Sequence, residues 1–200
     1  MQYIKIGGVI LVVASFVVMA ICLLHKNEPF FNLNQVFRKH FALFKNSKSQ
    51  YLVFYVLPLI LAIGLSMLYT AAEDFFTELS VILGIVLSVL LTILSILSGY
   101  DFSTVKNEEQ RKKGKAVVTD TINAITFNSL LCIFLLLYNL VLIVLAGGDY
   151  SWVPFDVAIL KITASIVAYY LFSVICLTLL LVVKQMSKII QFNLTVKKDS

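Results

Sequence analysis

One uncharged stretch, residues 79–99, constrains the fold of this chain more than any other feature. A helix rises 1.5 Å per residue, so about 20 residues cover the roughly 30 Å hydrocarbon core of a bilayer. The small or hydroxylated residues of this stretch recur at steps of three and four, which places them on one face of a helix. They are Ser80, Gly84, Ser88, Thr92, Ser95 and Gly99. Helices associate in lipid through close approach along small residues, so we predict a central transmembrane helix with this row as its packing or oligomer seam.

Four further apolar runs accompany the central one, at 6–24, 51–69, 127–146 and 159–183. The chain of 200 residues is 60% hydrophobic and only 14% charged, which is more apolar sequence than a soluble domain of that size can bury. The connections are too short to form a separate soluble domain. We therefore predict an all-α, polytopic integral membrane protein, in which residues 1–200 form a single bundle of five transmembrane helices.

The basic residues are distributed unevenly among the connections. Three alternate segments hold 14 of the 16 Lys and Arg residues, and these segments are 25–50, 100–126 and 184–200. Basic residues cross membranes poorly during insertion and so mark the cytoplasmic side. We expect the N-terminus outside and the C-terminus in the cytoplasm, most naturally across a bacterial cytoplasmic (inner) membrane. The first run lacks a small-x-small cleavage site, so we interpret it as an uncleaved anchor.

An amphipathic helix is predicted over 29–45, between the first two runs. Its apolar side is rich in Phe and its opposite side is basic, which is typical of a helix lying flat in the headgroup layer. The expected lipid-interface residues are Phe30, Phe37, Arg38, Lys39, Phe41, Phe44 and Lys45. Anionic lipids of the cytoplasmic leaflet would attract the basic side. The alternative is that the Phe side packs onto the bundle.

The remaining segments give more local expectations. Pro58 should kink the second span, and a short acidic turn should join the second and third spans as a tight antiparallel hairpin. The charged connection 100–126 is interrupted by Gly114, after which a single helix from Lys115 to Ala146 would be about 48 Å long and would overshoot the hydrocarbon. Apolar and polar residues alternate over 190–196, so this tail either adds a strand to a partner or is frayed.

Few residues point to chemistry. Ionised side chains are missing from four segments of the apolar runs, which are 51–69, 79–99, 127–146 and 162–183. Proteins that relay protons or couple transport to ions depend on such side chains, so this argues against both classes. Motifs of hydrolases, metalloenzymes and phosphate-binding loops are missing from the sequence. We therefore predict a non-enzymatic protein with no cofactor, no metal and no nucleic-acid partner. The neutral polar residues within the spans are Tyr138, Asn139, Tyr169 and Tyr170, which either form interhelical hydrogen bonds or line a narrow polar path.

Two functional hypotheses follow. The first is a membrane-embedded accessory or effector subunit that engages a cytoplasmic protein. Its expected partner contacts are Arg111, Lys112, Lys113, Lys115, Ile190, Phe192 and Leu194. The alternative is a homo-oligomeric channel or membrane-disrupting effector that assembles through the seam of 79–99. In general build the chain resembles small multi-pass bacterial proteins, some of which act as membrane effectors of antiviral defence systems. Because no motif carries this resemblance, it assigns no residue a role.

Overall fold

The computed structural model describes residues 8, 14–15, 33–42, 48–69, 71, 73–102, 105, 107–146 and 157–198. The chain divides into two compact units, Met1–Ala42 and Leu43–Ser200, and each is described by itself. The helix described in the first unit is α2 (Leu33–Ala42). The predicted first span, 6–24, lies outside the described residues apart from three single positions.

The second unit is built of helices wherever the structure describes it. Its elements are α3 (Lys48–Tyr51), the π-helical turn η1 (Leu52–Val56), α4 (Leu57–Leu68), α5 (Glu73–Ser98), α6 (Glu108–Ala146) and α7 (Val157–Lys198). Within the described chain, four helical stretches are long and apolar enough to cross a membrane: Ser49–Leu68, Asp74–Ser98, Glu108–Val144 and Lys161–Phe192. The predicted all-helical class and the last four of its apolar helices are therefore confirmed.

The turn η1 accommodates the proline of the second span. Pro58 stands in the first turn of α4, and the N–H of Leu57 donates to the carbonyl of Leu52, five residues back. In a regular α-helix a proline leaves one carbonyl without its N–H, and its ring collides with the carbonyl four residues back. The wider π turn relieves this crowding. At the predicted kink, the structure therefore has a local widening of the helix.

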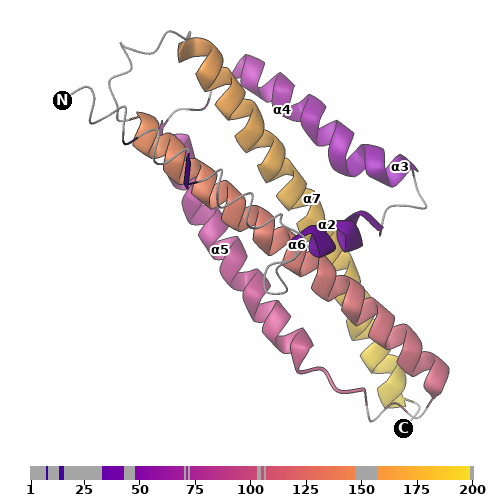
Figure 1. Ribbon diagram of the computed structural model, residues 1–200. Helices are drawn as coiled ribbons and strands as arrows, with labels where there is room; N and C mark the ends of the chain where they lie inside the picture. The colour runs from indigo at the N-terminus through magenta and orange to yellow at the C-terminus, as the bar shows by residue number, and fades with distance from the viewer. Residues whose placement is uncertain are drawn as a thin grey trace. The chain divides into compact units, whose positions relative to one another are not determined.

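The long helices of the second unit lie in the order α4, α7, α6, α5 (Figure 1). Helices α6 and α7 thus occupy the middle, and α4 and α5 form the two edges. The predicted hairpin between 51–69 and 79–99 is wrong, because α4 packs against α7 whereas α5 packs against α6.

Two hydrogen bonds explain why α4 and α5 separate. The hydroxyl of Tyr169 on α7 donates to the carbonyl of Tyr69 at 3.3 Å, and the N–H of Ala71 donates to Ser165 Oγ at 3.0 Å. The short connection after α4 is thereby fastened to the first half of α7. A short connection favours neighbouring helices only when nothing else binds it, and here it is bound to a third helix.

A buried stripe along α6 forms the core. Its members alternate at steps of four and three, the spacing of helices that pack with interlocking side chains. They are Gly114, Val118, Thr121, Ile125, Asn128, Cys132, Leu135 and Asn139, all buried. Helix α5 contributes a buried residue at every seventh position: Phe76, Leu83, Leu90 and Leu97. Because α6 packs against both α5 and α7, this stripe sets the order of three helices.

Helices α6 and α7 extend well beyond their apolar runs. With 39 and 42 residues, they are about 58 and 63 Å long. The expectation of one unbroken helix from Lys115 to Ala146 is confirmed, and α6 begins even earlier, at Glu108.

The predicted strand or frayed tail over 190–196 is wrong, because α7 continues as a helix to Lys198. Buried Val182 and Ile189 stand seven residues apart, and half-buried Phe192 follows three residues later. This helical spacing turns the tail toward α6. Packing on α6 therefore overrides the alternation of apolar and polar residues that suggested a strand.

The buried side chain of Asn128 provides a test of the α6 core. It is 0% exposed, and among the described residues neither of its amide atoms has a hydrogen-bonding partner. An unpaired buried amide costs about 1–3 kcal/mol, so we expect Asn128→Leu to raise the free energy of unfolding by that order. The substitution Asn128→Asp, which leaves the size of the side chain nearly unchanged, should lower the free energy of unfolding because it places an ionisable group in the core. Unfolding in mixed micelles would measure both, and destabilisation by Asn128→Leu would contradict the expectation.

Candidate functional site: the paired ends of α6 and α7

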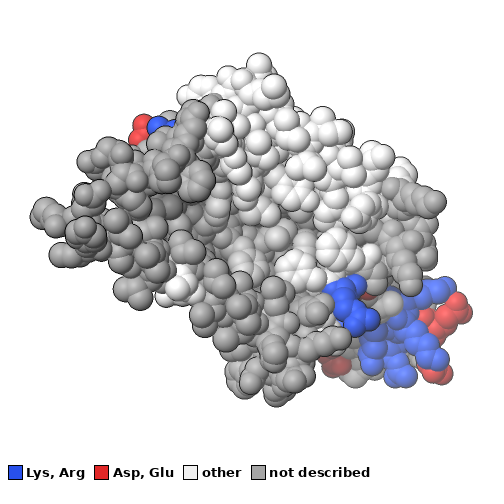
Figure 2. Space-filling model, turned by 45° about the horizontal axis from the view of Figure 1, so that its top comes forward, with Lys and Arg blue, Asp and Glu red and all other residues white. Residues whose placement is uncertain are grey.

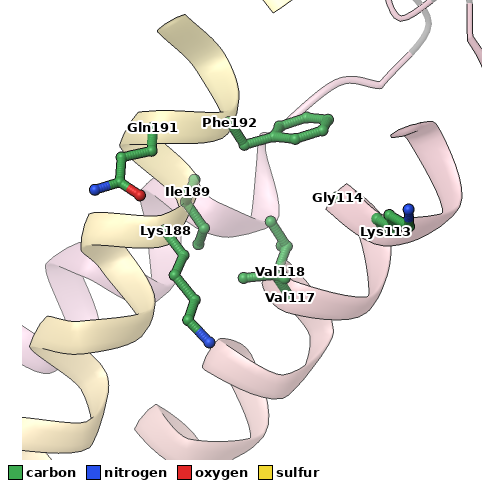
Figure 3. Close-up of a pocket in the computed structure, with 8 residues that line it drawn as sticks. All are labelled: Lys113, Gly114, Val117, Val118, Lys188, Ile189, Gln191 and Phe192. Carbon is green, nitrogen blue, oxygen red and sulfur yellow. The ribbon is translucent and has the colours of Figure 1, made fainter. Parts of the chain in front are cut away.

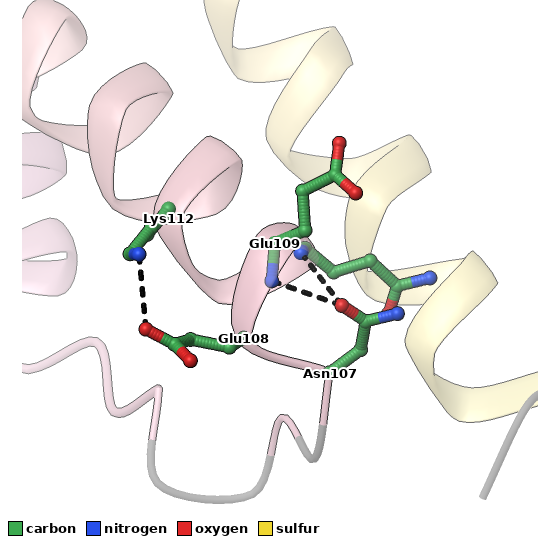
Figure 4. A network of polar contacts seen from close by, with 5 residues as sticks. Asn107, Glu108, Glu109 and Lys112 are labelled. Carbon is green, nitrogen blue, oxygen red and sulfur yellow. Dashed lines mark hydrogen bonds and ion pairs between the residues drawn. The ribbon is translucent and has the colours of Figure 1, made fainter.

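The start of α6 is fixed by a side-chain cap. Asn107 Oδ1 accepts hydrogen bonds from the backbone N–H groups of Glu109, at 2.9 Å, and Gln110, at 3.2 Å (Figure 4). Glu108 and Glu109 occupy the first turn, where negative charge is favoured by the helix dipole. An Asn followed by two Glu residues is a start signal that the sequence analysis missed. The cap makes α6 begin as a defined helix about 20 residues before its apolar run.

The first turns of α6 pair some charges and leave others unpaired. Lys112 and Glu108 lie 2.9 Å apart, and Lys113 and Glu109 lie 2.7 Å apart. Both pairs are exposed, so they hold local geometry more than they add stability. Within the described chain, four basic side chains near this end take part in no ion pair: Arg111, Lys115, Lys184 and Lys188. Figure 2 shows Lys and Arg side chains gathered together with Asp and Glu side chains at one end of this face, beside a broad uncharged surface.

Gly114 allows two aromatic rings to pack closely against α6. A Cβ atom there would lie 2.8 Å from Cε1 of Phe102 and 2.8 Å from Cε1 and Cζ of Phe192. The rings of Phe102, from the connection before α6, and Phe192, from α7, thus both pack against the backbone of α6 at Gly114. Phe102 also contacts Tyr100, with ring centroids 4.7 Å apart. A glycine inside a helix costs about 1 kcal/mol relative to alanine, and here ring packing offsets that cost.

A groove of about 310 Å³ lies between the two helices at this point. Helix α6 contributes Lys113, Gly114, Val117 and Val118, and helix α7 contributes Lys188, Ile189, Gln191 and Phe192. In Figure 3 the Lys188 side chain extends toward α6, whereas Gln191 points away from it. The groove therefore combines an apolar floor with lysines at its edges.

Two of the predicted partner contacts, Lys113 and Phe192, line this groove together although they are far apart in sequence. Arg111, Lys112 and Lys115 are exposed on α6, and Ile190 is exposed on α7. Leu194 belongs to α7, but its side chain lies outside the described residues. The sequence analysis missed Val117, Val118, Lys188 and Ile189, which only the register of the two helices brings together.

The predicted seam lies mostly on an open face of α5. Ser80 is half-buried and accepts a hydrogen bond from Asn139 Nδ2 at 3.3 Å. The other seam residues, Gly84, Ser88, Thr92, Ser95 and Gly99, are exposed. At Gly84 an added Cβ would have no atom within 4 Å. Helix α5 thus packs on α6 through its leucines, and most of the seam lies on a face of α5 that does not contact α6.

The polar residues that we predicted to lie within the membrane form three different hydrogen-bonded contacts between elements. Asn139 binds α5 through Ser80, and Tyr138 Oη donates to the carbonyl of Ala164 on α7 at 3.2 Å. Tyr169 binds the connection after α4, as described above, and Tyr170 is half-buried on α7.

The predicted lipid-interface helix is described only in its centre. Arg38, Lys39 and Phe41 are exposed on α2, and Phe37 is half-buried. Phe30, Phe44 and Lys45 lie outside the described residues.

Comparisons with known proteins return no relative. No family model, no curated protein and no solved structure matches this chain. In the part of the chain that the structure describes, there is also no group of three or more metal-ligating side chains. The site must therefore be interpreted from its own geometry.

Replacing Gly114 tests the packing that shapes the groove. In Gly114→Leu, the new side chain must displace the rings of Phe102 and Phe192, so we expect the ends of α6 and α7 to separate. Hydrogen exchange at the backbone amides of residues 108–120 should then become more than tenfold faster. This corresponds to a free energy of local opening that is lower by about 1.4 kcal/mol. Ala116→Leu is the matched control, because Ala116 is exposed on the same turn. Equal protection in both variants would contradict the packing.

Proposed function

We propose that this chain is a membrane-embedded accessory or effector subunit that engages a cytoplasmic protein through the paired ends of α6 and α7. The observation that carries the proposal is the continuation of these two helices past their apolar runs as one packed pair. A bundle that only needed to cross the membrane would gain nothing from 19 further residues of ordered helix in α6 and 15 in α7. A protruding pair of helices that carries a groove is instead suited to binding.

The distribution of charge supports the orientation that the proposal needs. With 14 of the 16 basic residues in 25–50, 100–126 and 184–200, the positive-inside rule favours five spans, an outer N-terminus and a cytoplasmic C-terminus. The paired ends of α6 and α7 belong to the second and third of these segments. In this orientation they face the cytoplasm of a cell whose inner membrane holds the bundle, where α2 could contact anionic lipid.

Charge reversal at the paired ends tests the proposal. We expect the triple variant Arg111→Glu, Lys115→Glu, Lys188→Glu to lose a cytoplasmic partner that the wild type captures after cross-linking in cells. These side chains are exposed and make no ion pair with the described residues, so folding should persist. The matched control is Arg38→Glu, Lys39→Glu on α2, which removes basic charge from the other unit. Recovery of the same partners by the triple variant would refute the proposal.

A second candidate function is a homo-oligomeric channel or membrane-disrupting effector. The observation that favours it is the exposed seam on α5, an edge helix whose small residues leave room for a second backbone. Assembly through this face would bring the hydroxyl groups of several chains together. This function requires self-association, whereas partner binding does not.

Bulky substitutions on α5 test this second function. Gly84→Leu combined with Ser88→Leu should convert an assembled protein to monomers and abolish any leakage of liposomes, because the added side chains fill the seam. Val89→Leu adds volume on an exposed face away from the seam and should leave assembly unchanged. Light scattering in detergent and dye release from liposomes would measure the two effects. A wild type that is monomeric and leaves liposomes intact would eliminate the channel.

A further inference from the structure

We infer that the groove between α6 and α7 binds an acidic amphipathic helix. It would insert one bulky apolar side chain beside Phe192 and place its carboxylates against Lys188 at the edge of the groove and against the neighbouring cations that make no ion pair with the described residues. This inference rests on the proposed function and names the chemistry of the partner.

The shape of the groove points to a side-chain anchor. Its floor is formed by Val117, Val118 and Ile189, and the ring of Phe192 closes one end (Figure 3). A volume of about 310 Å³ accommodates one large apolar side chain but not a globular surface. Helices that bind in grooves commonly present such anchors along one face.

The charges around the groove select an acidic partner. Residues 107–120 and 184–192 hold six basic and three acidic side chains. Two of the acids, Glu108 and Glu109, are paired with Lys112 and Lys113, which leaves the cations of α7 and two on α6 available. Separated carboxylates on a helix can meet these cations. A continuous phosphate backbone would also approach Glu108, Glu109 and Asp120, so nucleic acid is disfavoured.

The position of the groove disfavours a bilayer lipid. Gly114 lies thirteen residues before Phe127, and Phe192 lies nine residues after Val183, where the apolar runs end. At 1.5 Å per residue these are about 20 and 13 Å beyond the hydrocarbon, whereas a headgroup layer is about 5–8 Å thick. A lipid would have to leave the bilayer to fill the closed end. A peptide in the cytoplasm reaches it directly.

A binding assay with a defined peptide tests the inference. The full chain would be reconstituted in phosphatidylcholine nanodiscs, and the probe would be a fluorescent helical peptide of Glu, Ala and Leu with one central Trp. We expect Val117→Trp, which fills the groove, to weaken binding at least tenfold, which is about 1.4 kcal/mol. The Trp→Ser version of the peptide should bind equally weakly. Ala116→Trp, on the exposed side of α6, should bind as the wild type does.

A second variant guards against loss of folding in the first. Lys188→Glu reverses the charge of an exposed side chain at the edge of the groove. We therefore expect this variant to bind the acidic peptide at least tenfold more weakly, and to bind more tightly a peptide in which Lys replaces Glu. Unchanged binding in both variants would overturn the inference. Displacement of the peptide by phosphatidylglycerol vesicles or by oligothymidylate would also overturn it, in favour of lipid or nucleic acid.

The inference and the proposed function fail in different ways. If Arg111→Glu, Lys115→Glu, Lys188→Glu abolishes capture in cells while Val117→Trp retains it, the partner binds the basic surface and the groove plays no part. If both variants retain capture, both ideas fail. Loss of capture in both, with retention in Ala116→Trp, supports both.

Discussion

The interlocking of α6 with its two neighbours is the interaction on which the rest of the structure depends. In lipid, apolar side chains gain little by leaving acyl chains for one another, so the order of helices is set by close packing and by a few polar contacts. The buried stripe on α6 supplies the packing, and Asn139 and Tyr138 bond to α5 and α7 respectively. The same four-and-three spacing continues past the apolar run to Gly114. In the proposed topology the pair stands in water at that point, where burial of Val118 and Ile189 would stabilise it. One packing pattern would then operate both in lipid and in water.

Hydropathy was enough to predict four of the helices but not their arrangement. Length and composition predicted the four apolar helices, because a helix must satisfy its backbone hydrogen bonds wherever it crosses lipid. The order of the helices depended on contacts that sequence neighbourhood does not reveal. The connection after α4 is short enough for a hairpin, yet Tyr169 and Ser165 bind it to α7. The helical tail was likewise decided by distant residues, since Phe192 packs on Gly114.

The candidate site was predicted in two halves that the sequence could not join. The basic run of α6 and the apolar residues of the tail were both named as partner contacts. Only the antiparallel pairing of α6 with α7 places Lys113 beside Phe192. Gly114 was interpreted as an interruption, although its missing side chain is what admits the two rings. Two signals were available: Asn107 before two Glu residues, and the four-and-three spacing from Gly114 to Asn139.

The two candidate functions use different parts of the chain and are compatible. Within the described part of α6 and α7, the hydroxyls of Thr121 and Thr178 donate to carbonyls of their own helices, at 2.7 and 2.8 Å. Such hydroxyls offer little to a passing ion, and the same buried stripe of α6 also contains the apolar side chains of Ile125 and Leu135. A polar path would therefore have to form between chains, along the exposed side of α5. Assembly there would also bring several paired ends of α6 and α7 together. A partner with repeated acidic helices would then bind several grooves at once, and its affinity would rise without any new contact.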